Sequence, residues 1–120
     1  MNILIVDDNQ SITTMVSKYL RLKGNECAVS NSGKEGLEMI LQNEYDLIIL
    51  DISMPEFTGR DIVEHLDKNG MLQEKNIMLF TASAISREEI DGMIKKGLKG
   101  ALRKPVDLVD LDKALERFKK

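Results

Sequence analysis

Short apolar runs without polar alternation constrain the fold of this chain more than any other feature. Three of them occupy residues 3–6, 47–50 and 77–80, and a shorter one lies within residues 100–103. A strand buried on both faces has this composition, because neither face meets water. The intervening segments are long enough for helices and carry apolar residues at helical spacing. The pattern therefore predicts a parallel sheet with helices on both faces.

The whole chain is consistent with five strand and helix repeats in one domain, residues 1–120. The second strand is expected at residues 26–30, and helices are expected to start near Ser32, Thr58 or Gly59, and Ser86. The residues expected to face inward from the five helices, in chain order, are Ile12, Val16, Tyr19 and Leu20; Leu37, Ile40 and Leu41; Ile62, Val63 and Leu66; Ile90, Met93 and Ile94; and Leu108, Leu111, Leu115 and Phe118.

Polar residues with complementary chemistry follow four of the predicted strands. They are Asp7 and Asp8, Asp51, Thr81, and Lys104. Each one alone could simply cap a helix or form a loop. The carboxyl ends of parallel strands share one edge of the sheet, however, and open α/β folds bind ligands at that edge. These five residues therefore predict one site.

Carboxylates crowded at one edge need a cation. Two of them repel by about 4 kcal/mol at about 4 Å and an effective dielectric near 20. Oxygen ligands favour Mg²⁺ over zinc or copper, and Mg²⁺ is commonly held together with a phosphate. Lys104 could neutralise phosphoryl charge, and the Thr81 hydroxyl could donate to a phosphoryl oxygen. The sequence thus predicts a magnesium and phosphate site.

Composition excludes several classes of protein. No apolar stretch approaches the roughly 20 residues of a membrane helix, and the early first strand leaves no space for a signal peptide, so we expect a cytoplasmic protein. A net charge of -3 argues against a generic nucleic-acid surface. Cys27 is expected to be a buried structural thiol, and His65, the only histidine, a surface or half-buried residue without a metal.

These motifs together resemble the receiver domain of two-component response regulators over the whole chain. The resemblance implies the flavodoxin-like doubly wound fold, with five parallel strands in the order 2-1-3-4-5. It implies a signalling domain and not an enzyme in the ordinary sense, since such a domain catalyses only its own phosphotransfer and dephosphorylation. The segments that carry it are Asp7-Asp8, residues 51–59, Thr81-Ala82 and Lys104-Pro105.

The resemblance also implies a role for each residue at the site. Asp51 would accept a phosphoryl group from a phosphohistidine of a sensor histidine kinase or phosphotransfer protein. Asp8, Asp51 and the backbone carbonyl of Ser53 would bind Mg²⁺ directly, and Asp7 would bind it through water.

Thr81 and Lys104 would then hold the phosphoryl oxygens. Ser53 and Ser83 occupy positions that tune water access in similar receivers, although both could be ordinary loop serines. Ala101 stands where many receivers have a Tyr or Phe that turns inward on phosphorylation. The aromatic half of that switch is absent, so a switch here would rely on Thr81 and the loop that follows it.

The resemblance implies a downstream protein partner at the face formed by the fourth helix, the fifth strand and the fifth helix. The cations Lys95, Lys96, Lys99 and Arg103 predict an acidic partner there, although cations also favour a helix end by themselves. Two alternatives remain. A pseudo-receiver would bind partners without phosphorylation, and a haloacid-dehalogenase-like phosphatase would use an Asp-x-Asp motif that Asp7-Asp8-Asn9 does not provide.

Overall fold

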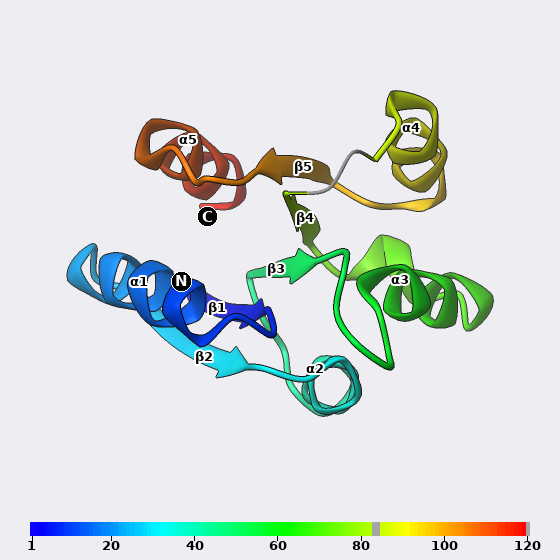
Figure 1. Ribbon diagram of the computed structural model, residues 1–120, viewed down its shortest axis with the longest axis horizontal. Helices are drawn as coiled ribbons and strands as arrows, with labels where there is room; N and C mark the ends of the chain where they lie inside the picture. Colours follow the sequence, from blue (N-terminus) through cyan, green and yellow to red (C-terminus); the bar gives the residue numbers. More distant parts are fainter. Residues whose placement is uncertain (83–84, 120) are drawn as a thin grey trace.

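The computed structural model describes residues 1–82 and 85–119. Five strands alternate with five α-helices, as the sequence predicts (Figure 1). The strands are β1 (Asn2–Val6), β2 (Glu26–Ser30), β3 (Leu47–Asp51), β4 (Ile77–Thr81) and β5 (Gly100–Arg103). The helices are α1 (Gln10–Leu22), α2 (Gly33–Gln42), α3 (Gly59–Lys68), α4 (Arg87–Lys96) and α5 (Leu108–Phe118), with a short 3₁₀ turn, η1 (Leu72–Glu74), before β4.

All five strands are parallel, and their order in the sheet is β2-β1-β3-β4-β5. The register places Val6 beside Leu50, Leu50 beside Leu79, and Leu79 beside Ala101. The strand ends are therefore level across the sheet. This confirms the doubly wound α/β fold and brings the residues after β1, β3, β4 and β5 to one edge.

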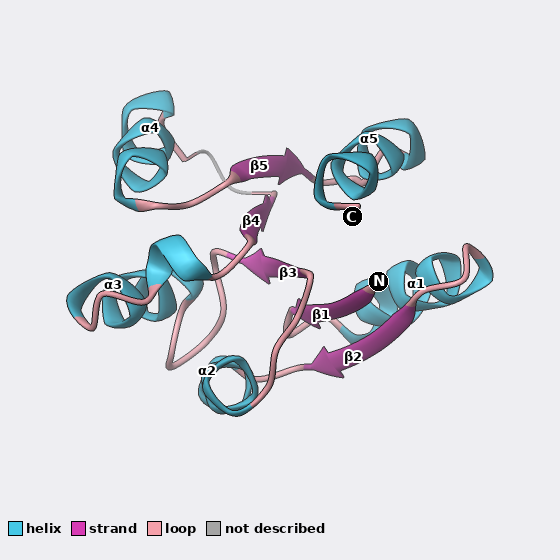
Figure 2. Ribbon diagram, turned by 180° about the vertical axis from the view of Figure 1, so that it is seen from behind, coloured by secondary structure: helices cyan, strands magenta, loops and turns pink. Residues whose placement is uncertain are grey.

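Helices cover both faces of the sheet, and each face has its own apolar core. Helices α1 and α5 lie on one face, whereas α2, α3 and α4 lie on the other (Figures 1 and 2). Alternate residues of one strand enter different cores, since Ile3 and Ile5 pack beneath α1 and α5 while Leu4 and Val6 pack on the opposite side. Burial on both faces explains the unbroken apolar runs.

Helix starts follow the predicted capping residues, with one difference in detail. The Thr58 hydroxyl accepts from the Asp61 backbone N–H, and the Asp61 carboxylate accepts from the Thr58 N–H, which forms a reciprocal capping box at α3. Ser86 also caps α4 by accepting from the Glu89 N–H at 3.0 Å. The Glu89 carboxylate does not complete that box; it binds Arg60 of α3 instead.

The inward-facing residues are largely as predicted, but three of them are exposed. Leu41, Ile94 and Leu108 have exposed fractions of 41%, 43% and 45%. Each lies in the first or last turn of its helix, so the apolar stripe continues beyond the part of the helix that is buried. Helix α4 is the extreme case, since none of its residues is buried, although Ile90 and Met93 pack partly against the core.

Within residues 1–82 and 85–119, the cluster of possible metal ligands contains neither Cys27 nor His65. Cys27 in edge strand β2 is half-buried, less enclosed than expected, and burial raises the pKa of its thiol to about 11. His65 lies exposed in the last turn of α3, as predicted. Within residues 1–82 and 85–119, no helix has both the length and the apolar composition required to cross a membrane.

Candidate phosphorylation and metal site

Three carboxylates converge at the carboxyl edge of the sheet. Asp7 follows β1, Asp8 is the next residue, and Asp51 ends β3. Each offers an oxygen within 4.8 Å of an oxygen of the others. Asp7 and Asp51 are buried, whereas Asp8 is exposed, so the cluster opens to solvent on the Asp8 side. The structure thus brings together the acids that the sequence pattern placed at one edge.

Lys104, which follows β5, lies across this acidic cluster. Its Nζ is 2.7 Å from Asp7 Oδ2 and 3.6 Å from Asp51 Oδ1. The ammonium also lies 5.2 Å from the centre of the Phe80 ring, and the Lys104 backbone N–H donates to the Thr81 carbonyl at 2.8 Å. The peptide bond from Lys104 to Pro105 is cis. One ammonium therefore faces two of the three acids.

Asp7 is fully buried, and its two carboxylate oxygens have different surroundings. Oδ1 accepts the backbone N–H of Asn9 at 2.9 Å. Oδ2 contacts the Lys104 ammonium, but this contact lacks hydrogen-bond geometry, and among the described residues no other group donates to that oxygen. A buried carboxylate oxygen that has an ion pair but no well-aligned hydrogen bond is incompletely compensated for its loss of water.

The surroundings of Asp51 disfavour its charged form. Burial and the nearby charge of Asp7, with a smaller contribution from Asp8, raise its pKa to about 6. Lys104 and the backbone N–H of Ser53, which donates to Oδ1 at 3.3 Å, act in the opposite direction but do not cancel the rise. The folded protein thus holds this carboxylate in a position that disfavours its charge.

The loop after Asp51 is fixed by close backbone approaches. A Cβ on Gly59 would lie 2.2 Å from the Asp51 carbonyl oxygen, so only glycine fits where α3 begins. The Gly59 N–H donates to the Ile52 carbonyl at 3.2 Å, and Met54 is buried. Glu56 has a φ of 66°, in the left-handed region. Met54 and Gly59 therefore help to fix the path of the loop after Asp51.

The remaining predicted residues have different surroundings. Thr81 is buried at the end of β4, and Ser53 is exposed two residues beyond Asp51. Ser83 lies outside the described residues. Ala101 is half-buried and packs on the face covered by α2, α3 and α4, with a methyl group where an aromatic ring would add bulk.

The residues at this edge fit a divalent cation with oxygen ligands. They supply three carboxylates, a single nearby ammonium and the buried Asp7 Oδ2 without a hydrogen bond. Mg²⁺ prefers carboxylate and carbonyl oxygens and keeps several waters, which suits a cluster that opens to solvent at Asp8. The chemistry of the donors therefore agrees with the magnesium expected from sequence.

Contacts that sequence reasoning missed tie the elements together. Asn31, after β2, donates to the Asp7 carbonyl, and Arg60 pairs with Glu89 between α3 and α4. The Lys99 ammonium donates to backbone carbonyls of Gln73, Lys75 and Gly97. Lys99 is therefore not a free surface cation, although the sequence groups it with the cations expected to meet an acidic partner. Side-chain to carbonyl bonds depend on loop geometry, and no periodicity in the sequence signals them.

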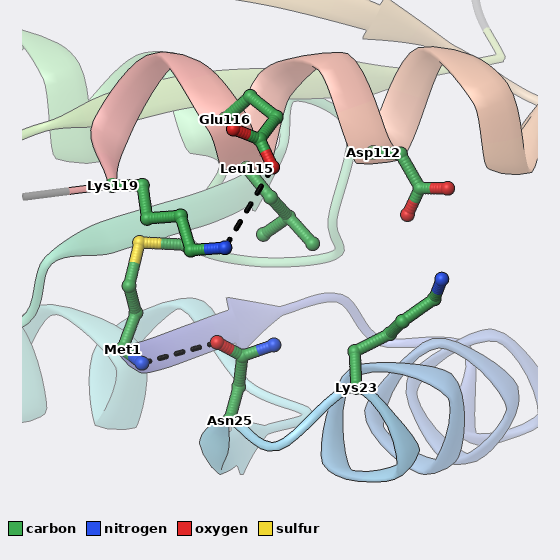
Figure 3. A pocket seen from close by; sticks show the side chains of 7 residues that line it. All are labelled: Met1, Lys23, Asn25, Asp112, Leu115, Glu116 and Lys119. Atoms are coloured by element: carbon green, nitrogen blue, oxygen red, sulfur yellow. Dashed lines mark hydrogen bonds and ion pairs between the residues drawn. The ribbon is translucent and has the colours of Figure 1, made fainter.

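The molecule also has a pocket far from the acids. A cavity of about 310 Å³ lies between the end of α1 and α5 (Figure 3). The Met1 amine donates to Asn25 at 3.1 Å, and Lys119 pairs with Glu116 at 3.7 Å; all four residues line the cavity. None of the predicted site residues lines it. The chemistry expected from sequence thus belongs to the acidic edge and not to this cavity.

Comparison with known proteins identifies the family and agrees with the fold. Residues 3–116 match the family described as the response regulator receiver domain. The chain belongs to this family. The match confirms the resemblance drawn from the motifs, and it makes this chain a signalling domain of the two-component type.

Curated relatives are longer than this receiver domain. Response regulator ArlR of Staphylococcus saprophyticus is 31% identical over 109 residues, which are 91% of this chain and 48% of that protein. The aerobic respiration control sensor protein ArcB of Escherichia coli is 28% identical over 118 residues, which are 98% of this chain and 15% of that protein. The chain thus spans less than half the length of either relative.

Solved structures agree over nearly the full chain. The chemotaxis protein CheY4 of Vibrio cholerae is 31% identical, with a TM-score of 0.84 and 98% of each chain covered. The response regulator protein TrrA of Thermotoga maritima, solved in complex with Mg²⁺ and BeF, is 25% identical, with a TM-score of 0.83 and 98% of each chain covered. These similarities extend to single receiver domains of the same length.

Proposed function

We propose that this receiver accepts a phosphoryl group on Asp51 in a Mg²⁺-dependent reaction with a sensor histidine kinase or phosphotransfer protein. The observation that carries the proposal is the surroundings of Asp51. Its carboxylate lies with Asp7 and Asp8 within 4.8 Å and has the Lys104 ammonium at 3.6 Å. Family membership and the Mg²⁺–BeF complex of the related TrrA support the same role.

In the proposed reaction, an oxygen of Asp51 forms a bond to phosphorus while the bond from phosphorus to the donor nitrogen breaks. The electron pair of the broken bond stays on the donor nitrogen, so an imidazole that is protonated on its other nitrogen leaves as a neutral ring. Asp51 becomes an aspartyl phosphate. A carboxylate is a weak nucleophile, so the rate depends on alignment and on neutralising the phosphoryl charge. Lys104, held beside Asp51, supplies one positive charge, and the Thr81 hydroxyl is assigned to a second phosphoryl oxygen.

The metal would be held by Asp8, Asp51 and the Ser53 carbonyl, with Asp7 acting through water. When bound, Mg²⁺ would supply charge neutralisation for the carboxylates and the incoming phosphate. Asp7 is already committed to Lys104 at 2.7 Å and to the Asn9 N–H, which agrees with an indirect role. Asp8 is the exposed acid and is suited to direct coordination.

Phosphorylation would act on other proteins through the face formed by α4, β5 and α5. Exposed Lys95, Lys96 and Arg103 favour an acidic partner, whereas Lys99 is removed from that set by its backbone contacts. Helix α4 is well placed to respond, because none of its residues is buried. We place this function in the cytoplasm and in a receiver unit of residues 1–120.

Labelling with acetyl phosphate tests the proposal. Wild-type protein with Mg²⁺ is expected to gain one acid-labile phosphate, which mass spectrometry locates at Asp51. The Asp51→Asn variant and wild-type protein in EDTA should remain unlabelled. Asp46→Asn, at the other end of β3, is the matched control and should label normally. Labelling of Asp51→Asn at the wild-type level would contradict the assignment and favour another acceptor, and a folded wild-type protein that never labels would favour the pseudo-receiver.

A further inference from the structure

The peptide bond between Asp7 and Asp8 receives support from outside its own loop. Strand β2 pairs with β1 as far as Val6 and Ser30, and the Asp7 N–H still donates to the Ser30 carbonyl at 3.0 Å. Beyond this point the chain turns into α2, and the backbone ladder ends. The Asp7 carbonyl then accepts the side-chain amide of Asn31 at 2.8 Å. Asn31 thus supplies the donor that the next ladder residue would have supplied.

The same amide nitrogen also contacts the first turn of α1. Asn31 Nδ2 lies 3.1 Å from Thr13 Oγ1, and the Thr13 hydroxyl in turn donates to the Gln10 carbonyl at 3.2 Å. Thr13 is buried. A primary amide has two hydrogens to donate, and both have acceptors here. Asn31 therefore links the end of β1 to the start of α1 across the segment that carries both acids.

Asp8 depends on this support more than its neighbours do. Asp7 is fixed by Lys104 and Asn9, and Asp51 by Ser53 and Lys104. Within the described part of the chain, no group donates a hydrogen bond to the Asp8 carboxylate. The position of the Asp8 side chain is consequently set by the Asp8 backbone. The Asp7 carbonyl that Asn31 holds lies in the same planar peptide unit as the Asp8 nitrogen and Cα.

We propose that Asn31 is a positioning residue for the Mg²⁺ site. By anchoring the Asp7 carbonyl to β2 and α1, Asn31 orients Asp8 towards the metal. The inference rests on the proposed function, because it takes Asp8 as a metal ligand. Groups that orient metal ligands through hydrogen bonds commonly contribute about 10-fold to 100-fold in metal affinity. Because Asn31 acts through one peptide unit, we expect an effect at the lower end, about 10-fold.

The chain provides a matched control at the opposite edge of the sheet. Asn76 donates its side-chain amide to the Asp46 carbonyl at 3.0 Å and so links the loops before β4 and β3. This bond has the same chemistry as that of Asn31 but lies at the other ends of the strands. Asn31→Ala and Asn76→Ala should therefore lower the midpoint of thermal unfolding in EDTA by similar amounts.

Calorimetric titration with Mg²⁺ separates a positioning role from a structural one. Asn31→Ala should bind Mg²⁺ about 10-fold more weakly than wild type, whereas Asn76→Ala should stay within about 2-fold. Thr13→Val removes only the second acceptor, so it should weaken Mg²⁺ binding less than Asn31→Ala does. If Asn31→Ala does not fold, Asn31→Ser, which shortens the side chain but keeps a donor, replaces it with the same expected loss.

The outcomes are distinct. Weaker Mg²⁺ binding by the Asn31 variant with unchanged binding by the Asn76 variant supports the inference. Equal Mg²⁺ affinity in wild type and the Asn31 variant overturns it and leaves the proposed function standing. Equal weakening in both asparagine variants also overturns it, since general destabilisation would then be the cause. A wild-type protein that binds no Mg²⁺ would overturn the inference and the metal dependence together.

Discussion

The two ends of the sheet use the same residue types in opposite ways. Asp46 lies just before β3 and Asp51 ends it, and Lys99 and Lys104 flank β5. At the amino end, Asp46 Oδ2 accepts the Asn2 N–H at 2.7 Å, and the Lys99 ammonium donates to backbone carbonyls at 2.9 and 3.0 Å. These charges are paired with neutral backbone groups. At the carboxyl end, Asp51 faces other acids.

The two ends of the sheet therefore differ in how well their charges are compensated. Charges at the amino end meet partners that the fold itself provides, and they close the loops there. At the carboxyl end, one ammonium serves two acids, a third acid lies close by, and a buried oxygen of Asp7 lacks a hydrogen bond. A bound cation would relieve the repulsion at that end, so its stability should depend on ligands.

The largest expected effect comes from removing the lysine at each end. In EDTA, Lys104→Met should lower the free energy of unfolding by about 3 kcal/mol, because it leaves buried Asp7 and Asp51 without a counter-charge. Lys99→Met should cost about 1 to 2 kcal/mol through lost hydrogen bonds to carbonyls. Urea denaturation measures both values.

Mg²⁺ provides the control for this pair. Added Mg²⁺ should recover part of the loss in Lys104→Met, because it replaces the lost positive charge at the acids, and it should not reduce the cost of Lys99→Met. Equal recovery of stability in the two variants would mean that the two ends do not differ in the way described.

The next effect has opposite signs at the two ends of β3. The pKa of Asp51 rises from the ordinary 3.8 to about 6, so folding loses stability as pH increases between these values. Asp51→Asn removes the charge and should stabilise the metal-free protein at pH 7 by about 2 kcal/mol, with the gain fading as pH falls towards about 4. Asp46→Ala should instead destabilise it by about 1 kcal/mol. Thermal melts in EDTA across this pH range test both; destabilisation by Asp51→Asn would contradict the repulsion.

A smaller effect concerns the exposed acid. Mg²⁺ at about ten times its dissociation constant should stabilise the wild type by about 1.4 kcal/mol. Asp8→Ala should remove most of this gain, and in EDTA it should leave stability equal or slightly higher because one repelling charge is gone. Thermal melts with and without Mg²⁺ measure the gain, with exposed Asp110→Ala as a control. An undiminished Mg²⁺ shift in Asp8→Ala would refute direct coordination.

The sequence predicted most of the architecture because burial leaves a periodic signal. Strands β1, β3 and β4 are apolar on both faces, and parallel pairing then dictates that Asp7, Asp51 and Thr81 share an edge. The cluster of acids thus followed from topology and from motifs that sit at strand ends.

Other features left no such signal. Leu41 and Ile94 continue an apolar helical stripe but are exposed, because the stripe does not reveal where the buried part of the helix ends. Glu89 fits a capping box by spacing, yet its carboxylate is taken by Arg60 from another helix. Asn31 acts through a loop whose path depends on the completed fold. Contacts between loops and helix surfaces require the three-dimensional structure.

The smallest expected effect concerns the ion pair between Arg60 of α3 and Glu89 of α4. The Arg60 Nε and Nη2 atoms donate to the Glu89 carboxylate at 2.6 and 3.1 Å, and this bidentate contact spans a groove beside the loosely packed α4. The hydrogen bond and the charge of Arg60 lower the pKa of Glu89. The side chains of Arg60 and Glu89 are 45% and 35% exposed.

Unlike the pair of Lys104 and Asp7, this contact is therefore screened by solvent. A double-mutant cycle with Arg60→Ala and Glu89→Ala should give a coupling free energy of about 0.5 to 1 kcal/mol, since the fork geometry is good but the pair is exposed. The coupling should shrink between about 0.1 and 1 M NaCl, and also as pH falls through the lowered pKa of Glu89, because protonation removes its charge. The i,i+4 pair of Glu64 and Lys68 on α3 is the control and should couple more weakly, because it joins residues of one helix. A coupling of about 3 kcal/mol that resists salt would place Arg60 and Glu89 with the buried charges at the carboxyl end of the sheet.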